Sequence, residues 1–193
     1  MSNSIVKLLK SKKTVFNMSD LAILWNIKNQ NSLKSKVYYL VDQGNIIRLH
    51  QGIFVLDNKY NKNELAGKLK SPSYVSLETI LRKTGCIFQY SNEISSISNT
   101  NKEYIINNVK YSYRKIKDSV LFNMESIDCH QNYSVAIKER AFLDMIYLNK
   151  NYYFDNLENI NWEKCEKIIK IYNNKILLKR LGSYKKYVGQ KQA

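Results

Sequence analysis

The feature that most constrains the fold is a change of hydrophobic period at Gly44, from helical before it to extended after it. The helical part has apolar residues at the i, i+4, i+7, i+8 spacing of one buried face: Leu33, Val37, Leu40 and Val41. Gly44 follows where a left-handed C-cap is needed. Residues 46–49 and 53–56 are short apolar runs joined by His50-Gln51-Gly52. The sequence therefore predicts a helix, a glycine stop and a β-hairpin.

Two more helices are expected upstream. Apolar residues at helical spacing predict the first over residues 4–13, and Val15-Phe16 form an extended link. Ser19 is a suitable N-cap for a second helix over 20–25, and Ser32 for the helix that ends at Gly44. Helices joined by a short polar turn (26–31) and followed by a hairpin are the parts of a winged helix-turn-helix, a module that binds DNA.

In that module the last helix enters the major groove, so its solvent face should carry the DNA-reading residues. Amides pair with base edges, hydroxyls and Lys contact phosphates, and the helix N-terminus attracts a phosphate oxygen. The candidates on this helix and its leading end are Gln30, Asn31, Ser32, Lys34, Ser35, Tyr38 and Tyr39. On the small wing, Arg48, His50 and Gln51 would reach the flanking backbone or the minor groove. One of the two tyrosines is expected to pack at the edge of the wing.

The distribution of charge also indicates a polyanionic partner. The chain has 31 Lys+Arg against 16 Asp+Glu, a net charge of +15. Residues 1–70 have 12 against 4, residues 71–169 have 12 against 12, and residues 170–193 have 7 against 0. Such focused fields raise the local concentration of a polyanion. An AT-rich genome would favour Lys and Asn codons everywhere, but it does not explain the balanced middle.

Ser71-Pro72 marks a domain boundary, because the residue before a proline is pushed out of helical geometry. We therefore expect domains at 1–70 and 71–193. In the second, patterning predicts a helix over 76–84, strands between 94 and 116 with a hairpin turn at Asn107-Asn108, and short strands at 120–122 and 133–137. Helices follow over 140–148, 162–172 and 175–188. The fold class is α+β: an N-terminal winged helix-turn-helix and then a mixed α/β domain that ends in helices.

The last of these helices is basic and amphipathic. Its cations form a possible second basic surface: Lys175, Lys179, Arg180 and Lys186. Such a helix could lie on DNA, on RNA or in an acidic protein groove. A solvated face over an ordinary packed helix is an equally good interpretation.

The motifs of catalysis, metal binding and membrane insertion are missing from the sequence. It has no Gly-rich phosphate loop, no G-x-S-x-G, no H-E-x-x-H and no two-metal carboxylate cluster. The three cysteines have no C-x-x-C spacing, and Glu139 and Asp144 are five residues apart, too far round a helix to share a face well. No apolar run approaches the ~18 residues of a membrane span. We expect a cytoplasmic protein that is not an enzyme and needs no cofactor or metal.

Four segments together resemble the AbiEi antitoxins of the AbiE abortive-infection systems. They are residues 33–54, which match that family's winged helix in order and spacing, and residues 72–79 (PSYVSLET), 111–114 (YSYR) and 135–144 (VAIKERAFLD). The resemblance covers roughly residues 12–150, and the order of the segments is its main support. Lys138 stands where the family pattern P-E-K-A-L-L-D commonly has Pro, and Arg140 replaces Lys. Both changes leave the apolar spacing intact.

The resemblance implies the antitoxin of a type IV toxin–antitoxin system, a group that serves in phage defence. Such a protein represses its own operon by binding inverted repeats in the promoter through the winged helix. It also counteracts a nucleotidyltransferase-like toxin, directly or functionally, through the second domain. The alternatives are a protein-interaction module that binds an acidic partner and a stand-alone regulator without a toxin. The polar leading end, Gln30-Asn31-Ser32, favours DNA, because a protein-binding groove would expose apolar anchors there.

Overall fold

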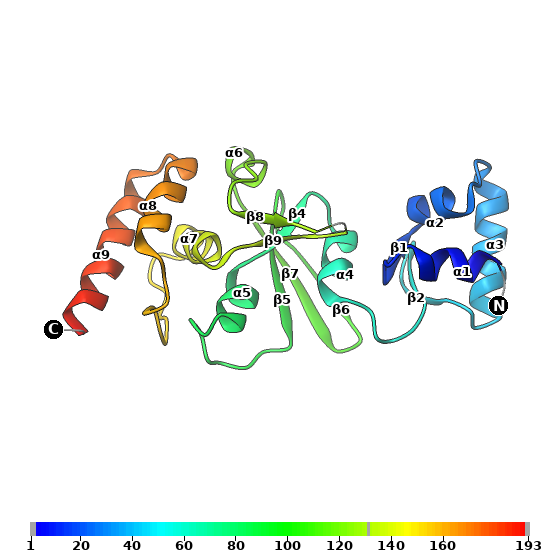
Figure 1. Cartoon of the computed structure of the whole chain (residues 1–193), viewed down its shortest axis with the longest axis horizontal. Helices are drawn as coiled ribbons and strands as arrows, with labels where there is room; N and C mark the ends of the chain where they lie inside the picture. Colours follow the sequence, from blue (N-terminus) through cyan, green and yellow to red (C-terminus); the bar gives the residue numbers. More distant parts are fainter. Residues whose placement is uncertain (1–2, 131, 192–193) are drawn as a thin grey trace. The chain divides into compact units, whose positions relative to one another are not determined.

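The computed structural model describes residues 3–130 and 132–191 and divides into two compact units (Figure 1). Unit 1 is Met1–Leu69 and unit 2 is Lys70–Ala193. Both combine helices with a sheet, and unit 2 ends in helices, so the expected α+β class is confirmed. In the described part of the chain, no helix is both long enough and apolar enough to cross a membrane.

Unit 1 has helices packed against a small antiparallel sheet of strand order β1-β3-β2. Its elements are α1 (Asn3–Lys10), β1 (Val15–Asn17), α2 (Met18–Trp25), α3 (Gln30–Asp42), β2 (Ile47–His50), β3 (Ile53–Val55) and α4 (Lys62–Leu69). The predicted helices, extended link and hairpin are confirmed, with ends that shift by a few residues. This arrangement is compatible with a winged helix-turn-helix, in which α3 is the recognition helix and β2–β3 the wing.

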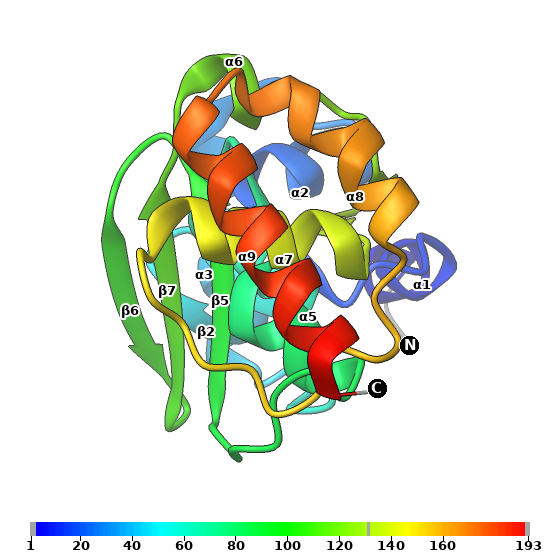
Figure 2. The same ribbon diagram turned by 90° about the vertical axis from the view of Figure 1, so that its left-hand side faces the viewer.

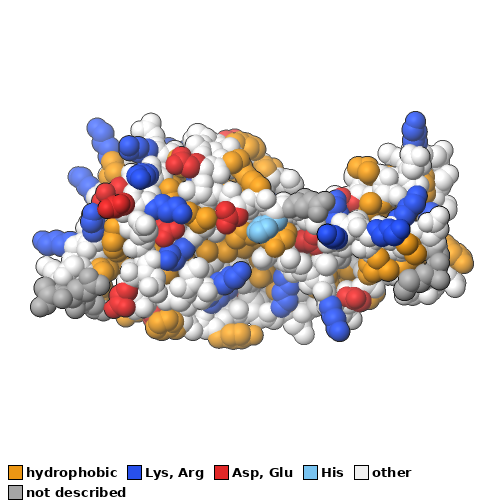
Figure 3. Space-filling model, viewed as in Figure 1, with side chains coloured by type: hydrophobic (Ala, Val, Ile, Leu, Met, Phe, Trp, Pro, Cys, Tyr) orange, Lys and Arg blue, Asp and Glu red, His pale blue; other side chains and the backbone are white. Residues whose placement is uncertain are grey.

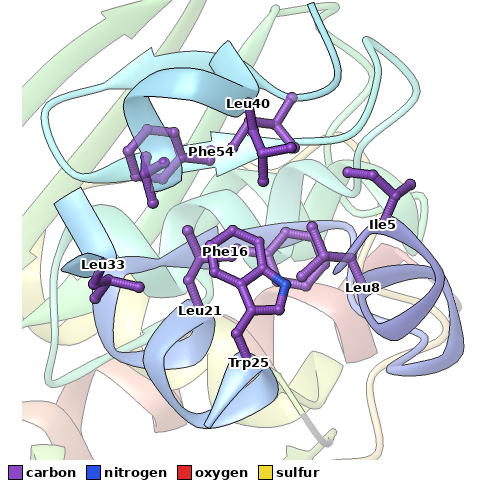
Figure 4. Packing of buried hydrophobic residues seen from close by; sticks show 10 residues of the cluster. Ile5, Leu8, Phe16, Leu21, Trp25, Leu33, Leu40 and Phe54 are labelled. Atoms are coloured by element: carbon purple, nitrogen blue, oxygen red, sulfur yellow. The ribbon is translucent and has the colours of Figure 1, made fainter. Parts of the chain in front are cut away.

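The core of unit 1 forms where α1, α2 and α3 meet the sheet (Figure 4). Its buried side chains are Ile5, Leu8, Phe16, Leu21, Trp25, Leu33, Val37, Leu40, Ile46 and Phe54. The indole Nε1 of Trp25 donates a hydrogen bond to the carbonyl oxygen of Ser4 at 3.1 Å, which joins α2 to α1. The face of α3 expected to be buried is therefore buried, and its opposite face is left for solvent.

Asparagines, rather than the predicted serines, cap α2 and α3. The Asn17 side chain accepts a bond from the Asp20 amide at 2.8 Å, and the Asp20 carboxylate accepts one from the Asn17 amide at 3.0 Å, a capping box. Asn29 caps α3 by accepting from the Ser32 amide at 3.0 Å. The predictions of Ser19 and Ser32 as N-caps are wrong, because both helices begin earlier and both serines lie within the first turn.

The end of α3 follows the prediction. Gly44 has a φ of +66°, in the left-handed region that glycine adopts at little cost. The next two amides, those of Asn45 and Ile46, both donate to the carbonyl oxygen of Leu40, at 2.9 and 3.3 Å. The chain is thereby reversed and enters β2.

Two buried acids hold the remaining elements of unit 1 together. Asp20 forms ion pairs with Lys13 at 2.8 Å and with Lys68 of α4 at 2.6 Å. Burial by itself raises the pKa of Asp20, but the Asn17 hydrogen bond and the two lysines outweigh it, so the pKa lies below its ordinary value. Glu64 accepts hydrogen bonds from the Thr14 amide at 2.7 Å and from the Thr14 hydroxyl. Helix α4 is thus fixed to α2 and β1.

Unit 2 is a mixed sheet of strand order β6-β7-β5-β4-β9-β8, covered by two layers of helices. In Figure 2, α5 and α7 lie in front of the sheet, and α8 and α9 lie over α7. The elements are β4 (Ser73–Val75), α5 (Leu77–Lys83), β5 (Glu93–Ser98), β6 (Lys102–Ile106), β7 (Val109–Lys115), α6 (Asp118–Leu121), β8 (Ile127–Cys129), β9 (Ser134–Ala136), α7 (Lys138–Leu148), α8 (Trp162–Ile168), the 3-10 helix η1 (Ile169–Tyr172) and α9 (Lys175–Lys191).

The hairpin turn at Asn107-Asn108 is confirmed, with φ values of +50° and +59° between paired strands β6 and β7. The predicted strand at 120–122 is wrong, because residues 118–121 form the helical turn α6. This turn is held by Arg140, whose Nη2 donates to the carbonyl oxygen of Val120 at 2.7 Å. Strand β8 was not expected, since its three residues are too few to show alternation.

A buried polar network ties α7 to the sheet and to η1. The carboxylate of Asp144 accepts hydrogen bonds from the hydroxyls of Tyr172 at 2.6 Å, Ser76 at 2.7 Å and Tyr74 at 3.1 Å. Arg140 Nε lies 3.5 Å from Asp144 Oδ1, and both side chains have 0% exposure. Tyr74 and Ser76 come from residues 72–79 and Arg140 and Asp144 from residues 135–144, so these two segments meet in the interior of unit 2.

Candidate nucleic-acid interface

The outward face of α3 is a polar strip. Asn31, Ser35 and Tyr38 follow one another at i, i+4 and i+7, so they lie along one line of the helix. All three are exposed, whereas Leu33 and Val37 on the opposite side are buried. At 1.5 Å per residue the strip spans roughly 10 Å along the helix, and a helix about 10–12 Å in diameter fits a major groove about 12 Å wide.

The structure exposes all ten residues that the sequence predicts for this interface. On α3, Lys34 and Tyr39 flank the strip, and Gln30 and Ser32 lie in its first turn. Tyr38 is 70% exposed and Tyr39 is 61% exposed. The expectation that one tyrosine packs against the wing is therefore wrong: both positions lie away from the face that α3 buries.

The hairpin that the sequence predicts as a wing consists of edge strand β2 and the turn that leads to β3. Arg48, His50 and Gln51 are exposed on it, and the pairing with β3 shifts between Arg48 and His50. The Arg48 guanidinium lies 5.6 Å from the centroid of the Phe54 ring, a cation–π contact across the hairpin. Gly52, with a φ of +71°, makes the turn possible.

The lysines of unit 1 differ in how accessible their charges are to a polyanion. Lys13 and Lys68 are paired with Asp20. Lys36 lies 4.7 Å from the centroid of the Trp25 ring, and partial burial, with a contribution from Lys7, lowers its pKa. Lys34 is exposed beside the strip, and so is Lys28 in the turn before α3. Lys28 was missed in the sequence analysis, although it is the only basic residue in that polar break.

One acidic residue of α3 lies near the polar strip and would repel phosphates from one end of it. Asp42 is exposed at the C-terminal end of α3, four residues after Tyr38, and α3 has no acidic residue in its first turn. Phosphates would be attracted to the N-terminal half of the helix and repelled from its C-terminal end. The charge pattern thus favours an approach through the leading end of α3.

The possible second basic surface on α9 is present only in part. Lys175, Lys179 and Lys186 are exposed. Arg180 is not part of that surface, because its Nη1 donates to the carbonyl oxygens of Ile146 at 2.6 Å and Tyr147 at 3.2 Å. Arg180 therefore caps the C-terminal end of α7, a role that only the packing of α9 against α7 determines.

Beside α9 lies an aromatic cavity that the sequence analysis missed. It has a volume of about 400 Å³, and its aromatic lining is Tyr152, Tyr153, Phe154, Tyr184 and Tyr187. The run NYYF at 151–154 and the pair of tyrosines three residues apart on α9 are the signals that could have indicated it.

Figure 3 shows Lys and Arg side chains gathered over the end of unit 2 formed by α8 and α9.

The remaining reactive side chains are isolated or buried. Cys165 is buried, and burial raises the pKa of its thiol to about 12, so it is protonated at neutral pH. His130 stacks on Tyr133, with ring centroids 4.7 Å apart. Among the described residues, no three His, Cys, Asp or Glu side chains lie close enough together to hold a metal ion.

No protein-family model matches this chain, and no curated protein matches it either.

Proposed function

We propose that the chain is a DNA-binding antitoxin that represses its own operon. The observation that carries the DNA-binding part is the exposed strip Asn31-Ser35-Tyr38, on a helix whose other face is fixed in the core of unit 1. A rigid helix with amides and hydroxyls outward and Lys34 at its side has the groups that read base edges and hold phosphates.

Within this proposal, α3 enters the major groove by its leading end. Gln30 and Asn31 would pair with base edges, as amide side chains do with adenine, and Ser35 and Tyr38 would bond phosphates or bases further along. Arg48, His50 and Gln51 of the wing would contact the flanking backbone or minor groove. An inverted repeat would seat two copies of the chain on one operator.

The antitoxin part rests on the resemblance to the AbiEi family. Under it, unit 2 counteracts a nucleotidyltransferase-like toxin in the cytoplasm. Co-expression with a neighbouring gene of that kind tests this part: growth restored by the full chain supports it, and undiminished growth arrest contradicts it. A protein-interaction module is the second candidate, because Tyr38 and Tyr39 are large exposed side chains of the kind that anchor protein interfaces.

Lys34→Ala is expected to weaken binding to operator and unrelated duplexes alike. If Lys34 neutralises one phosphate, the slope of log K against log salt falls by ~0.9. Fluorescence anisotropy over a salt series measures it. Lys59→Ala is the matched control, because Lys59 is exposed in the same unit but belongs to the segment between β3 and α4. Equal slopes for both variants would show that Lys34 makes no phosphate contact.

Asn31→Ala is expected to relax sequence preference rather than weaken all binding. Losing one bidentate base contact costs about 1–3 kcal/mol of discrimination at the base pair it reads. Competition between the operator and single-base variants measures this difference. Asn58→Ala, a change in the exposed loop after β3, is the control. An Asn31→Ala protein that keeps the full preference of the unchanged chain would remove Asn31 from the base-reading set.

A further inference from the structure

The aromatic cavity of unit 2 lies between the segment after α7 and helix α9. A second hollow of about 220 Å³ shares Phe154, Leu157 and Tyr187 with it, so the two form one groove. Asp155 and Glu158 line the second hollow, so the aromatic cavity beside Lys150 is the part that suits an anionic ligand. Both lie wholly within unit 2. The groove is of the size that small aromatic ligands occupy.

The groove has a fixed floor and an open rim. The Tyr184 hydroxyl donates to the carbonyl oxygen of Tyr152 at 2.6 Å and accepts from its amide at 3.2 Å, which holds the 151–154 segment against α9. The rings of Phe154 and Tyr184 meet edge to face, with centroids 5.4 Å apart. Tyr153 is 74% exposed and Tyr187 is 46% exposed. Two aromatic side chains are therefore exposed to solvent, at the edge of a groove whose base is held by hydrogen bonds.

Three lysines form a row on α9, the helix that supplies one wall of the groove. Lys175, Lys179 and Lys186 are exposed and share one face of α9, and Ser183, which lines the groove, lies beside that face. The row extends over eleven residues, roughly 16 Å at 1.5 Å per residue. Helix α9 contains no acidic residue. Lys150 adds a cation on the opposite wall.

We propose that this groove binds single-stranded nucleic acid. A base stacks on Tyr153 or Tyr187, the Asn151 amide faces its edge, and the phosphates of neighbouring nucleotides follow the lysine row. Aromatic rings beside a cationic track are the means by which proteins hold single strands without strict sequence preference. A duplex keeps its bases stacked inside, so it cannot use the rings. A free mononucleotide has one phosphate group and would leave most of the row without a partner.

This site belongs to unit 2 and does not depend on the proposed role of α3. The probe is a fluorescein-labelled twelve-residue oligouridylate, titrated with the full chain. Tyr153→Phe keeps the ring and is expected to bind as the unchanged chain does. Tyr153→Leu is expected to bind at least about five-fold more weakly, the lower limit for losing one stacked base. Phe122→Leu, an exposed aromatic after α6 that does not line the groove, should leave binding unchanged.

A second measurement tests the phosphate track. Lys179→Ala is expected to lower the salt slope for the oligouridylate by ~0.7, the value for one phosphate of a single strand. Uridine monophosphate should compete only at concentrations far above that of the oligonucleotide. Equal affinity of Tyr153→Leu and Tyr153→Phe, or competition by uridine monophosphate at equal concentration, would overturn the proposal.

The same samples separate this proposal from the function of unit 1. If Tyr153→Leu loses the single strand but keeps the operator duplex, the groove is a site in its own right. If the unchanged chain does not bind the operator but binds the oligouridylate in a Tyr153-dependent way, the proposal of operator binding fails and the proposal of a single-strand site is supported. An acidic twelve-residue peptide that displaces the oligouridylate at equal concentration would instead assign the groove to a protein partner and overturn the proposal.

Discussion

Asp144→Asn is expected to lower the free energy of unfolding of unit 2 by about 3–5 kcal/mol. Asp144 is fully buried, accepts three hydroxyl hydrogen bonds and balances the equally buried charge of Arg140. The asparagine keeps the size of the side chain but leaves the guanidinium without an anion. Urea unfolding followed by far-UV circular dichroism measures the loss, with hydrogen exchange to assign it to unit 2.

A double variant separates the charge from the packing. Arg140→Gln together with Asp144→Asn removes both charges and keeps an oxygen acceptor for the three hydroxyls, so it should cost less than Asp144→Asn alone because no uncompensated charge remains in the interior. If Asp144→Asn changes the unfolding free energy by less than about 1 kcal/mol, the network does not hold unit 2 as described.

Phe16→Ala is expected to destabilise unit 1 by about 3–5 kcal/mol, the usual cost of removing a buried aromatic ring. Phe16 is 1% exposed at the centre of the cluster that includes Leu21 and Trp25. The cavity would undermine the packing that holds α3, so operator binding should fall with stability. Trp25 belongs to the same cluster, and its fluorescence should report the loosening.

Leu9→Ala is the matched control for Phe16→Ala. Leu9 lies on α1 in the same unit, but it is 52% exposed and outside the cluster. It should cost no more than about 0.5 kcal/mol. Equal losses for the two variants would show that the cluster is not the stabilising core of unit 1.

The parts of the fold that could be predicted are those with local causes. The spacing of Leu33, Val37 and Leu40 fixes which side of α3 is buried, and so it also fixes which residues face solvent. Gly44 and the Asn107-Asn108 turn depend on backbone conformations that particular residues favour. The seven candidate residues on α3 follow from this apolar spacing, and the three on the β2–β3 hairpin follow from the hairpin prediction, which is why all ten are exposed.

The errors come from contacts between residues distant in sequence. Val120 lies in a helical turn because Arg140, twenty residues later, binds its carbonyl oxygen. Arg180 counts as a surface cation in the sequence, but it caps α7 once α9 is packed. Likewise, the net charge of residues 1–70 gives no sign that Lys13 and Lys68 form ion pairs with Asp20. The N-cap of a helix is also hard to predict where two nearby residues are equally suitable, as with Asn17 and Ser19 at the start of α2.

The aromatic groove was missed for the same reason: the tyrosines are visible in the sequence, but the packing that brings them together is not. Tyr152 and Tyr184 are joined by hydrogen bonds although they are far apart in the sequence. Each segment alone reads as an ordinary apolar stretch with tyrosines. Only the packing of α9 brings the rings together, on the helix that also carries the lysine row.

Sequence-specific DNA binding is tested most directly by titrating the full chain against the DNA upstream of its own gene and against a scrambled duplex of equal length, over a salt series. We expect binding that depends on sequence and persists at ~200 mM salt, where nonspecific attraction to phosphates has largely been lost. Equal binding to both duplexes, lost in parallel as salt rises, would contradict it. The positive charge would then act without sequence preference, and the protein-interaction alternative would take precedence.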